Sequence, residues 1–152
     1  MDYVTGNLID LAEQGYFDII VQGCNCFKTM GGGIAREIRS RYPKAAEVDA
    51  SYSFSGDYTK LGNYTVMPGK SFNIINAYTQ YNMSTGSDVF EYTAFDLILQ
   101  KLAYQYSTCR FGFPMIGCGL AGGDEYRIMD SIRGFAETIA PSGGTVTIVK
   151  MP

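Results

Sequence analysis

The sequence predicts a single α/β domain in which helices cover a mixed or parallel sheet. Short apolar segments, typical of buried strands, alternate along the chain with segments that have helical periodicity. No internal repeat, low-complexity tract or linker interrupts the 152 residues, which are enough to bury one continuous core. We therefore expect residues 1–152 to form one domain.

Three segments have apolar residues at helical spacing. Residues 90–106 have the strongest pattern, and Asp88 followed by Glu91 is typical of a capping box at a helix start. Residues 33–42 predict a second helix, which the following proline ends. Residues 125–139 predict a third, ended by a Pro-Ser-Gly-Gly segment. The predicted inward faces are Phe95, Ile98, Leu99, Leu102 and Tyr106 in the first helix, Ile34, Ile38 and Tyr42 in the second, and Ile128, Ile132, Phe135 and Ile139 in the third.

Five apolar segments between these helices predict strands. They are residues 17–22, 64–67, 72–77, 111–116 and 145–149. Residues 49–60 are rich in Ser, Tyr and Gly and predict a loop.

The charge and hydropathy of the chain exclude several kinds of partner. The net charge is −3 and the isoelectric point about 4.8, which argues against a broad nucleic-acid surface, because Lys and Arg dominate the binding of nucleic-acid phosphates. No apolar run approaches the ~20 residues of a membrane span, and the first residues do not resemble a secretory signal. We expect a cytoplasmic monomer with no membrane partner. A small anionic ligand is compatible with this charge, since backbone N–H groups bind phosphate without net positive charge.

The chain contains no histidine. Ser-His-Asp and Cys-His catalytic arrangements and histidine-ligated metal sites are therefore excluded. The four cysteines, Cys24, Cys26, Cys109 and Cys118, lack the spacing of zinc ligands, and we expect them to be reduced and mostly structural. No metal or cofactor is expected.

Two glycine-rich loops each connect a predicted strand to a predicted helix. Strand 17–22 leads to a Gly-Gly-Gly run at 31–33, and strand 111–116 leads to the loop 117–123. Ligands of such sheets bind at the carboxyl ends of the strands, so the two loops are expected to bracket a diphosphate with their N–H groups. Each loop alone could equally be a tight turn, and neither matches the Walker A or dinucleotide pattern. The pair predicts a phosphate site without identifying the nucleotide.

Several motifs resemble those of the macro domain family. Residues 21–26 (Val-Gln-Gly-Cys-Asn-Cys) and 30–35 (Met-Gly-Gly-Gly-Ile-Ala) resemble its first signature, and residues 114–124 (Pro-Met-Ile-Gly-Cys-Gly-Leu-Ala-Gly-Gly-Asp) resemble its second. Residues 5–8 (Thr-Gly-Asn-Leu) resemble its opening turn, and residues 75–78 (Ile-Asn-Ala-Tyr) its central strand. The resemblance spans essentially the whole chain. It is greatest to the small branch similar to ADP-ribose 1″-phosphate phosphatases, which has fungal and bacteriophage members.

This resemblance implies a three-layer α/β/α sandwich with a central mixed sheet. It also implies a small-molecule ligand, ADP-ribose or its 1″-phosphate. Asn25 would hydrogen-bond the distal ribose, although an amide in a loop can instead cap backbone groups. Asn7 and Leu8 would lie beside the adenine, and the family usually has Asp where this chain has Asn7. The other implied ligand-binding residues are Gly31, Gly32, Gly33 and Ile34 near the distal ribose and its phosphate, and Gly117, Cys118, Gly119, Leu120, Ala121 and Gly123 around the diphosphate.

Asp124 is the main candidate for catalysis. It follows the second glycine loop and begins a predicted helix, whose macrodipole favours the ionised carboxylate, a form suited to a base that activates water. Asp is also a favoured helix N-cap, and one residue can serve both roles. Asn25 would position water and substrate. Cys118 is a weaker candidate nucleophile, because no base or cationic partner is evident.

Three functions fit this pocket. The first is hydrolysis of ADP-ribose 1″-phosphate to ADP-ribose and phosphate. The second is removal of ADP-ribosyl groups from protein or nucleic acid, but Ala121 stands where the branch that cleaves ADP-ribose from glutamate has Asp. The third is non-catalytic binding of ADP-ribose. One of Phe27, Tyr78 and Tyr126 is expected to cover the adenine or the distal ribose.

Overall fold

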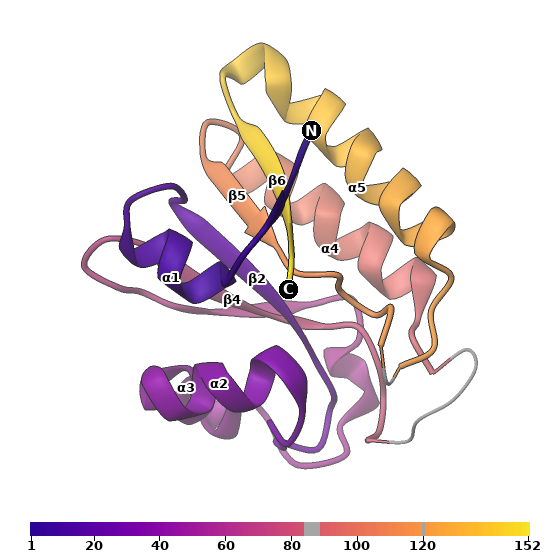
Figure 1. Ribbon diagram of the computed structural model, residues 1–152. Coiled ribbons are helices and arrows are strands. Elements are labelled where there is room, and N and C mark those ends of the chain that lie inside the picture. Colours follow the sequence, from indigo (N-terminus) through magenta and orange to yellow (C-terminus); the bar gives the residue numbers. More distant parts are fainter. Residues whose placement is uncertain (84–88, 120) are drawn as a thin grey trace.

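The computed structural model describes residues 1–83, 89–119 and 121–152 and contains a six-stranded sheet (Figure 1). The strand order is β1-β6-β5-β2-β4-β3. All neighbouring strands are parallel except β3, which pairs antiparallel with β4 at one edge, so the sheet is mixed as predicted. The strands are β1 (Asp2–Thr5), β2 (Ile19–Cys24), β3 (Tyr64–Met67), β4 (Asn73–Tyr78), β5 (Arg110–Phe113) and β6 (Thr145–Lys150).

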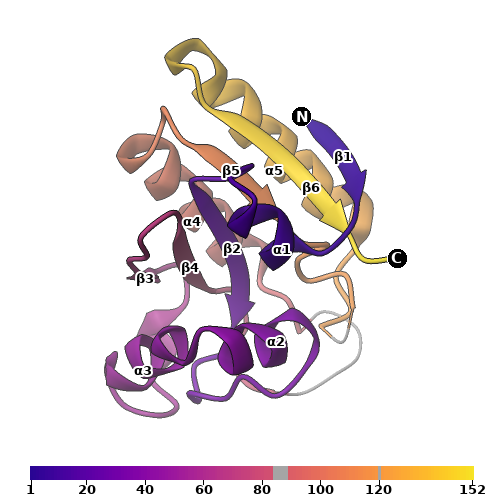
Figure 2. The ribbon, with the colours of Figure 1, turned by 60° about the vertical axis from the view of Figure 1, so that its left-hand side comes forward.

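Helices cover both faces of the sheet, and Figures 1 and 2 show the three layers. One face is covered by α4 (Tyr92–Gln105) and α5 (Glu125–Ile139), and the other by α1 (Leu8–Glu13), α2 (Gly33–Arg41) and α3 (Pro43–Ser51). Two short 3₁₀ helices, η1 (Tyr58–Lys60) and η2 (Ala140–Ser142), complete the regular structure of the described residues. The predicted α/β/α sandwich is confirmed.

Alternation along the central strands produces a separate core on each face. In β2, Ile19 and Val21 pack among the residues of α4 and α5, whereas Ile20 packs with α1 and α2. The predicted inward residues of α5, from Ile128 to Ile139, are buried on the first face. No helix in the described part of the chain is long and apolar enough to cross a membrane.

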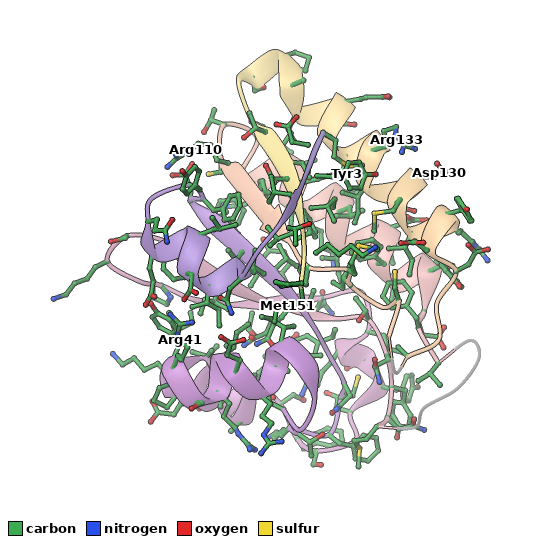
Figure 3. All side chains as sticks on the ribbon, viewed as in Figure 1. Tyr3, Arg41, Arg110, Asp130, Arg133 and Met151 are labelled. Carbon is green, nitrogen blue, oxygen red and sulfur yellow. The ribbon has the colours of Figure 1, made fainter. Side chains whose placement is uncertain are left out.

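Polar side chains link α1 and α2 on the second face. Arg41, at the end of α2, points toward α1 (Figure 3) and forms ion pairs with Asp10 at 2.9 Å, with Glu37 at 3.1 Å and with Glu13. Tyr42 also donates its hydroxyl to Glu13 at 2.6 Å. These contacts hold the end of α2 against α1. Because a helix is stiff, they also fix the place of its start relative to the sheet.

Several predicted boundaries change in the structure. The helix predicted over 90–106 begins at Tyr92, and its N-cap is Glu91 without a side-chain cap bond, so the predicted capping box is wrong; Asp88 lies outside the described residues. The strand predicted over 111–116 ends at Phe113, because the following Pro114 has no N–H for the ladder. The strands predicted over 17–22 and 72–77 lie two and one residues further along, at Ile19–Cys24 and Asn73–Tyr78.

The sequence did not predict β1, α1 or α3. The segment 49–60 was predicted as a loop, but its first residues belong to α3 and its last to η1. Pro43 ends α2 as predicted and also begins α3, since its fixed φ and missing N–H suit the first position of a helix.

Candidate functional site

A pocket of about 470 Å³ lies at the carboxyl ends of the central strands, between the two glycine-rich loops. The structure therefore brings together the two loops that the sequence singled out. The residues that line the pocket are Gly23 and Cys24 at the end of β2, Asn25, Thr29, Gly31, Gly32, Gly33, Ile34 and Ala35 from the first loop and its helix, Thr79, Gln80 and Met83 after β4, Pro114, Met115 and Ile116 after β5, and Gly117, Gly119 and Ala121 from the second loop. These lining residues include no carboxylate, lysine or arginine.

Asn25 organises the first glycine loop through its side-chain amide. Its Oδ1 accepts the N–H of Phe27 at 2.8 Å, and its Nδ2 donates to Thr29 Oγ1 at 2.7 Å and to the Thr29 carbonyl at 3.2 Å. Asn25 is 9% exposed and lines the pocket. The hydrogen bonds of Asn25 are therefore those of an amide that caps its own loop. Its contact with a ribose stays a prediction.

The start of α2 faces the pocket without a cap. Gly32, the N-cap, is extended and has no side chain to accept a hydrogen bond, and Gly33 has a left-handed φ of 56°. Gly33, Ile34 and Ala35 are the first three helical residues, and all three line the pocket. The N–H groups at such positions have no partner within the helix and lie at the positive end of its dipole. This helix start is therefore prepared to bind an anion.

The second glycine loop is closed on itself. The N–H of Gly123 donates to the carbonyl of Gly117 at 2.8 Å, and the N–H of Phe90 donates to the carbonyl of Ala121 at 3.3 Å. Gly117, Gly119 and Ala121 line the pocket, whereas Gly123 serves to close the loop. Leu120, also a predicted ligand-binding residue, lies outside the described residues.

Cys118 belongs to the second loop but does not line the pocket. It packs against the core beneath α4 and α5, and its Sγ donates to the Ile116 carbonyl at 3.4 Å. Burial, together with the nearby charges of Glu125 and Asp124, raises the pKa of the thiol to about 11. A neutral, inward-packed thiol is a poor nucleophile, so the structure disfavours the alternative of cysteine catalysis.

Asp124 caps α5. Its Oδ1 accepts the N–H of Tyr126 at 3.0 Å and that of Arg127 at 3.4 Å. Its own N–H donates to the hydroxyl of Tyr92 at 2.8 Å, and the Arg127 guanidinium lies 3.9 Å from the centroid of the same ring. Asp124 is not among the pocket-lining residues. The two helix starts next to the loops therefore differ, because that of α5 is capped and that of α2 is open.

Asn7 and Leu8 lie at the start of α1. Asn7 is its N-cap and accepts the N–H of Asp10 at 2.9 Å, while its Nδ2 donates to Glu37 Oε1, also at 2.9 Å. Leu8 is buried in the core below α1. Neither residue lines the pocket, and their predicted contact with adenine stays a prediction.

The three candidate aromatic residues also lie away from the pocket lining. Tyr78 is fully buried beneath the first loop, Phe27 packs edge-on against Tyr81, and Tyr126 is exposed on α5. Thr79 and Gln80, by contrast, line the pocket and were not predicted. They follow β4, which pairs with β2. The rule that ligands bind at the carboxyl ends of the strands, which identified the glycine loops, therefore applies to them as well. No sequence feature of this kind marks the other pocket residues Thr29, Met83 and Met115.

All four cysteines are free. Cys24 lines the pocket from a buried position, and burial raises the pKa of its thiol well above the ordinary value. Within the described ranges, no three His, Cys, Asp or Glu side chains are grouped as metal ligands.

Comparisons with known proteins identify the class to which this fold belongs. The chain has the macrodomain fold. It is 32% identical over 151 residues to the uncharacterized 17.5 kDa protein of the tk-vs intergenic region of Enterobacteria phage T4, with 90% of this chain and 87% of that protein covered. A shorter match, 46% identical over 43 residues, is to the ADP-ribose 1″-phosphate phosphatase of Saccharomyces cerevisiae and covers 28% of this chain and 23% of that enzyme. No family model matches the chain.

Solved structures share the fold. A protein from Bacteroides thetaiotaomicron superposes with a TM-score of 0.84 at 20% identity, covering 99% of both chains. The macrodomain of Thermus aquaticus DarG does so with a TM-score of 0.75 at 18% identity, covering 99% of this chain and 97% of that one. A Trypanosoma brucei macrodomain in complex with ADP has a TM-score of 0.70 at 15% identity and covers 99% of this chain and 63% of that one.

Proposed function

We propose that this protein binds ADP-ribose and its derivatives in the pocket between the two glycine loops, and that it hydrolyses ADP-ribose 1″-phosphate to ADP-ribose and phosphate. One observation carries the proposal: the uncapped start of α2 lines the same pocket as the second glycine loop. Two similar proteins support the ligand, since one is an ADP-ribose 1″-phosphate phosphatase and the other is a macrodomain solved in complex with ADP.

Backbone N–H groups supply the binding chemistry. The lining residues that the structure describes include no cationic side chain, so we assign the binding of a diphosphate there to oriented N–H groups of Gly33, Ile34 and Ala35 and of the second loop. Hydrogen bonds from N–H to an ionised oxygen are stronger than neutral ones, and the helix dipole adds to them. At Gly31 a Cβ would meet no atom of the described residues beyond its chain neighbours within 4 Å, so the missing side chain leaves space for a ligand.

Hydrolysis requires a water molecule that attacks phosphorus. The water oxygen forms a bond to phosphorus, the bond between phosphorus and the oxygen on C1″ breaks, and that oxygen leaves as the ribose hydroxyl with the proton that the water has given up. In the proposal, Asn25 positions substrate and water, and Asp124 accepts the proton of the water. Asp124 Oδ1 is used by the helix cap, so Oδ2 is the oxygen assigned to this step.

Non-catalytic binding is the second candidate function. It is favoured by the absence of any carboxylate or basic side chain from the described pocket lining. A pocket of backbone donors and neutral side chains binds an anion without offering a general acid or base from its walls.

Two measurements separate these functions. Calorimetric titration with ADP-ribose tests binding, and phosphate release from ADP-ribose 1″-phosphate tests the phosphatase, with ADP-ribosylated protein and ADP-ribosylated DNA assayed alongside. Binding with phosphate release is the expected result. Binding without turnover of any of the three substrates supports the second candidate, and release of ADP-ribose from protein or DNA alone shows a hydrolase of that kind. If ADP-ribose does not bind, the proposal is wrong.

A further inference from the structure

Lys60 is a buried ionisable side chain that the proposed reaction does not use. It is the last residue of η1 and is 1% exposed. Its Nζ has no hydrogen-bond acceptor among the residues that the structure describes. Burying an ammonium group is costly unless other interactions compensate, so its neighbours must account for its position.

Two stacked tyrosine rings lie beside this ammonium, and one of them is hydrogen-bonded to a buried carboxylate. Lys60 Nζ lies 4.7 Å from the ring centroid of Tyr78 and 5.6 Å from that of Tyr52, within the range of cation–π attraction. The two rings stack with their centroids 5.4 Å apart. The Tyr78 hydroxyl donates to Oδ1 of Asp49 at 2.8 Å, and Asp49 is 2% exposed. We call Lys60, Tyr52, Tyr78 and Asp49 the lysine cluster.

The lysine cluster lies directly beneath the first glycine loop. Tyr78 ends β4 and packs against Cys24 and Met30 in one small hydrophobic core. Cys24 and Met30 flank the segment that carries the pocket residues Asn25 and Thr29. The position of the Tyr78 ring therefore sets the position of both ends of this segment.

A second loop, residues 52–57, which we call the outer loop, is hydrogen-bonded to the same segment. Lys28 Nζ donates to the carbonyl of Ser53 at 2.6 Å, and the N–H of Gly56 donates to the carbonyl of Cys26 at 2.8 Å. Lys28 and Ser53 have left-handed φ angles of 61° and 60°. Non-glycine residues keep this conformation only where the surrounding structure imposes it.

The outer loop is anchored at both ends by the lysine cluster. It begins at Tyr52, whose ring lies near the Lys60 ammonium, and it leads through η1 to Lys60 itself. The cluster thus packs against the first glycine loop and also anchors the outer loop, which is hydrogen-bonded to the first glycine loop.

We infer that Lys60 is a positioning residue for the first glycine loop: by holding Tyr52 and Tyr78 together, it fixes the segment that carries Asn25 and Thr29. Lys60 does not line the pocket and acts through the two rings. The inference rests on the proposed function only for the affinity measurement with ADP-ribose. The order of the loop is measured by amide exchange, which needs no ligand.

The test replaces Lys60 by an uncharged side chain of similar length, Lys60→Met. Hydrogen–deuterium exchange of residues 25–33 and calorimetric titration with ADP-ribose are compared with wild type. Exchange of the hydrogen-bonded amides of this segment, such as those of Cys26 and Phe27, is expected to become at least about tenfold faster, and the Kd for ADP-ribose to rise by about tenfold. Should this variant not fold, the double variant Lys60→Met, Asp49→Asn takes its place, and the same changes are expected. The double variant leaves no unpaired carboxylate, and the introduced amide oxygen still accepts the hydrogen bond of the Tyr78 hydroxyl.

Ile139→Ala is the matched control. Ile139 is fully buried at the end of α5, in the core of the other face, so this variant loses stability without touching the lysine cluster. It should lower the melting temperature while leaving loop exchange and ADP-ribose affinity within about twofold of wild type. If Lys60→Met changes the exchange of residues 25–33 no more than the control does, Lys60 is merely structural and the inference is wrong. If wild type itself does not bind ADP-ribose, the proposed function fails, while the exchange measurement still decides the role of Lys60.

Discussion

The ring of Phe90 lies directly against Gly117, where the second glycine loop begins. A Cβ on Gly117 would lie 2.4 Å from Phe90 Cδ1, and the φ of Gly117 is 74°, so both space and backbone require glycine. A Cβ on Gly119, two residues later, would meet no described atom within 4 Å apart from those of its chain neighbours. The two pocket glycines thus have different roles, since the first allows the loop to pack and the second keeps the pocket open.

Gly117→Ala is expected to destabilise the fold by about 2–4 kcal/mol, the sum of a left-handed alanine and an overpacked contact with Phe90. Gly119→Ala should leave the free energy of unfolding within about 0.5 kcal/mol of wild type, yet weaken ADP-ribose binding. Urea unfolding and calorimetry measure the two effects. Equal stability of the two variants would contradict the difference in role.

Gly31→Ala is expected to reduce the affinity for ADP-ribose by at least about tenfold without loss of stability. The new methyl group would meet no protein atom within 4 Å and would occupy space beside the open start of α2. Gly134→Ala is the control, because Gly134 lies within α5 with open space around its Cα. That change should stabilise the protein by about 0.5–1 kcal/mol and leave the Kd unaltered. Unchanged affinity in Gly31→Ala would place the ligand elsewhere.

Asp124→Asn separates the cap of α5 from the proposed base. Asn is as good an N-cap as Asp but cannot accept the proton of water, so phosphate release should fall by about a hundredfold at nearly unchanged stability. Asp124→Ala should in addition cost about 1 kcal/mol of stability, because the N–H groups of Tyr126 and Arg127 lose their acceptor. Phosphate assays and thermal unfolding measure the two quantities. If Asp124→Asn released phosphate as fast as wild type, Asp124 would serve only as the N-cap of α5 and not as the base.

The pH dependence of Cys118 alkylation tests whether this thiol takes part in chemistry. A thiol is neutral below its pKa, and the pKa of Cys118 is raised to about 11, so roughly one molecule in a thousand carries the thiolate at about pH 8. Iodoacetamide should therefore modify Cys118 slowly at that pH and faster as the pH rises toward 11, as followed by mass spectrometry of the peptide. Cys118→Ser should retain ADP-ribose binding and phosphate release. Rapid alkylation at pH 8 would show a reactive thiolate after all.

Much of the fold follows from local pattern. The bounds of α5 and β3 were predicted to the residue, because helical periodicity and short apolar runs are properties of contiguous sequence. The strand β1 was missed since all four of its residues are exposed, which leaves no apolar run to detect. Helix α3 was missed because its apolar residues are few and mostly alanine.

The sequence by itself determined the α/β class, the two glycine loops and their place after the central strands, since glycine runs and strand–helix alternation are local features. The tertiary structure decided which donors are open to a ligand. Asp124 accepts the first N–H groups of α5, while Gly32 leaves those of α2 exposed to the pocket. It also decided that Lys60 is buried beside two stacked tyrosine rings contributed by different segments. Both outcomes depend on contacts between residues far apart in the chain, which no local pattern records.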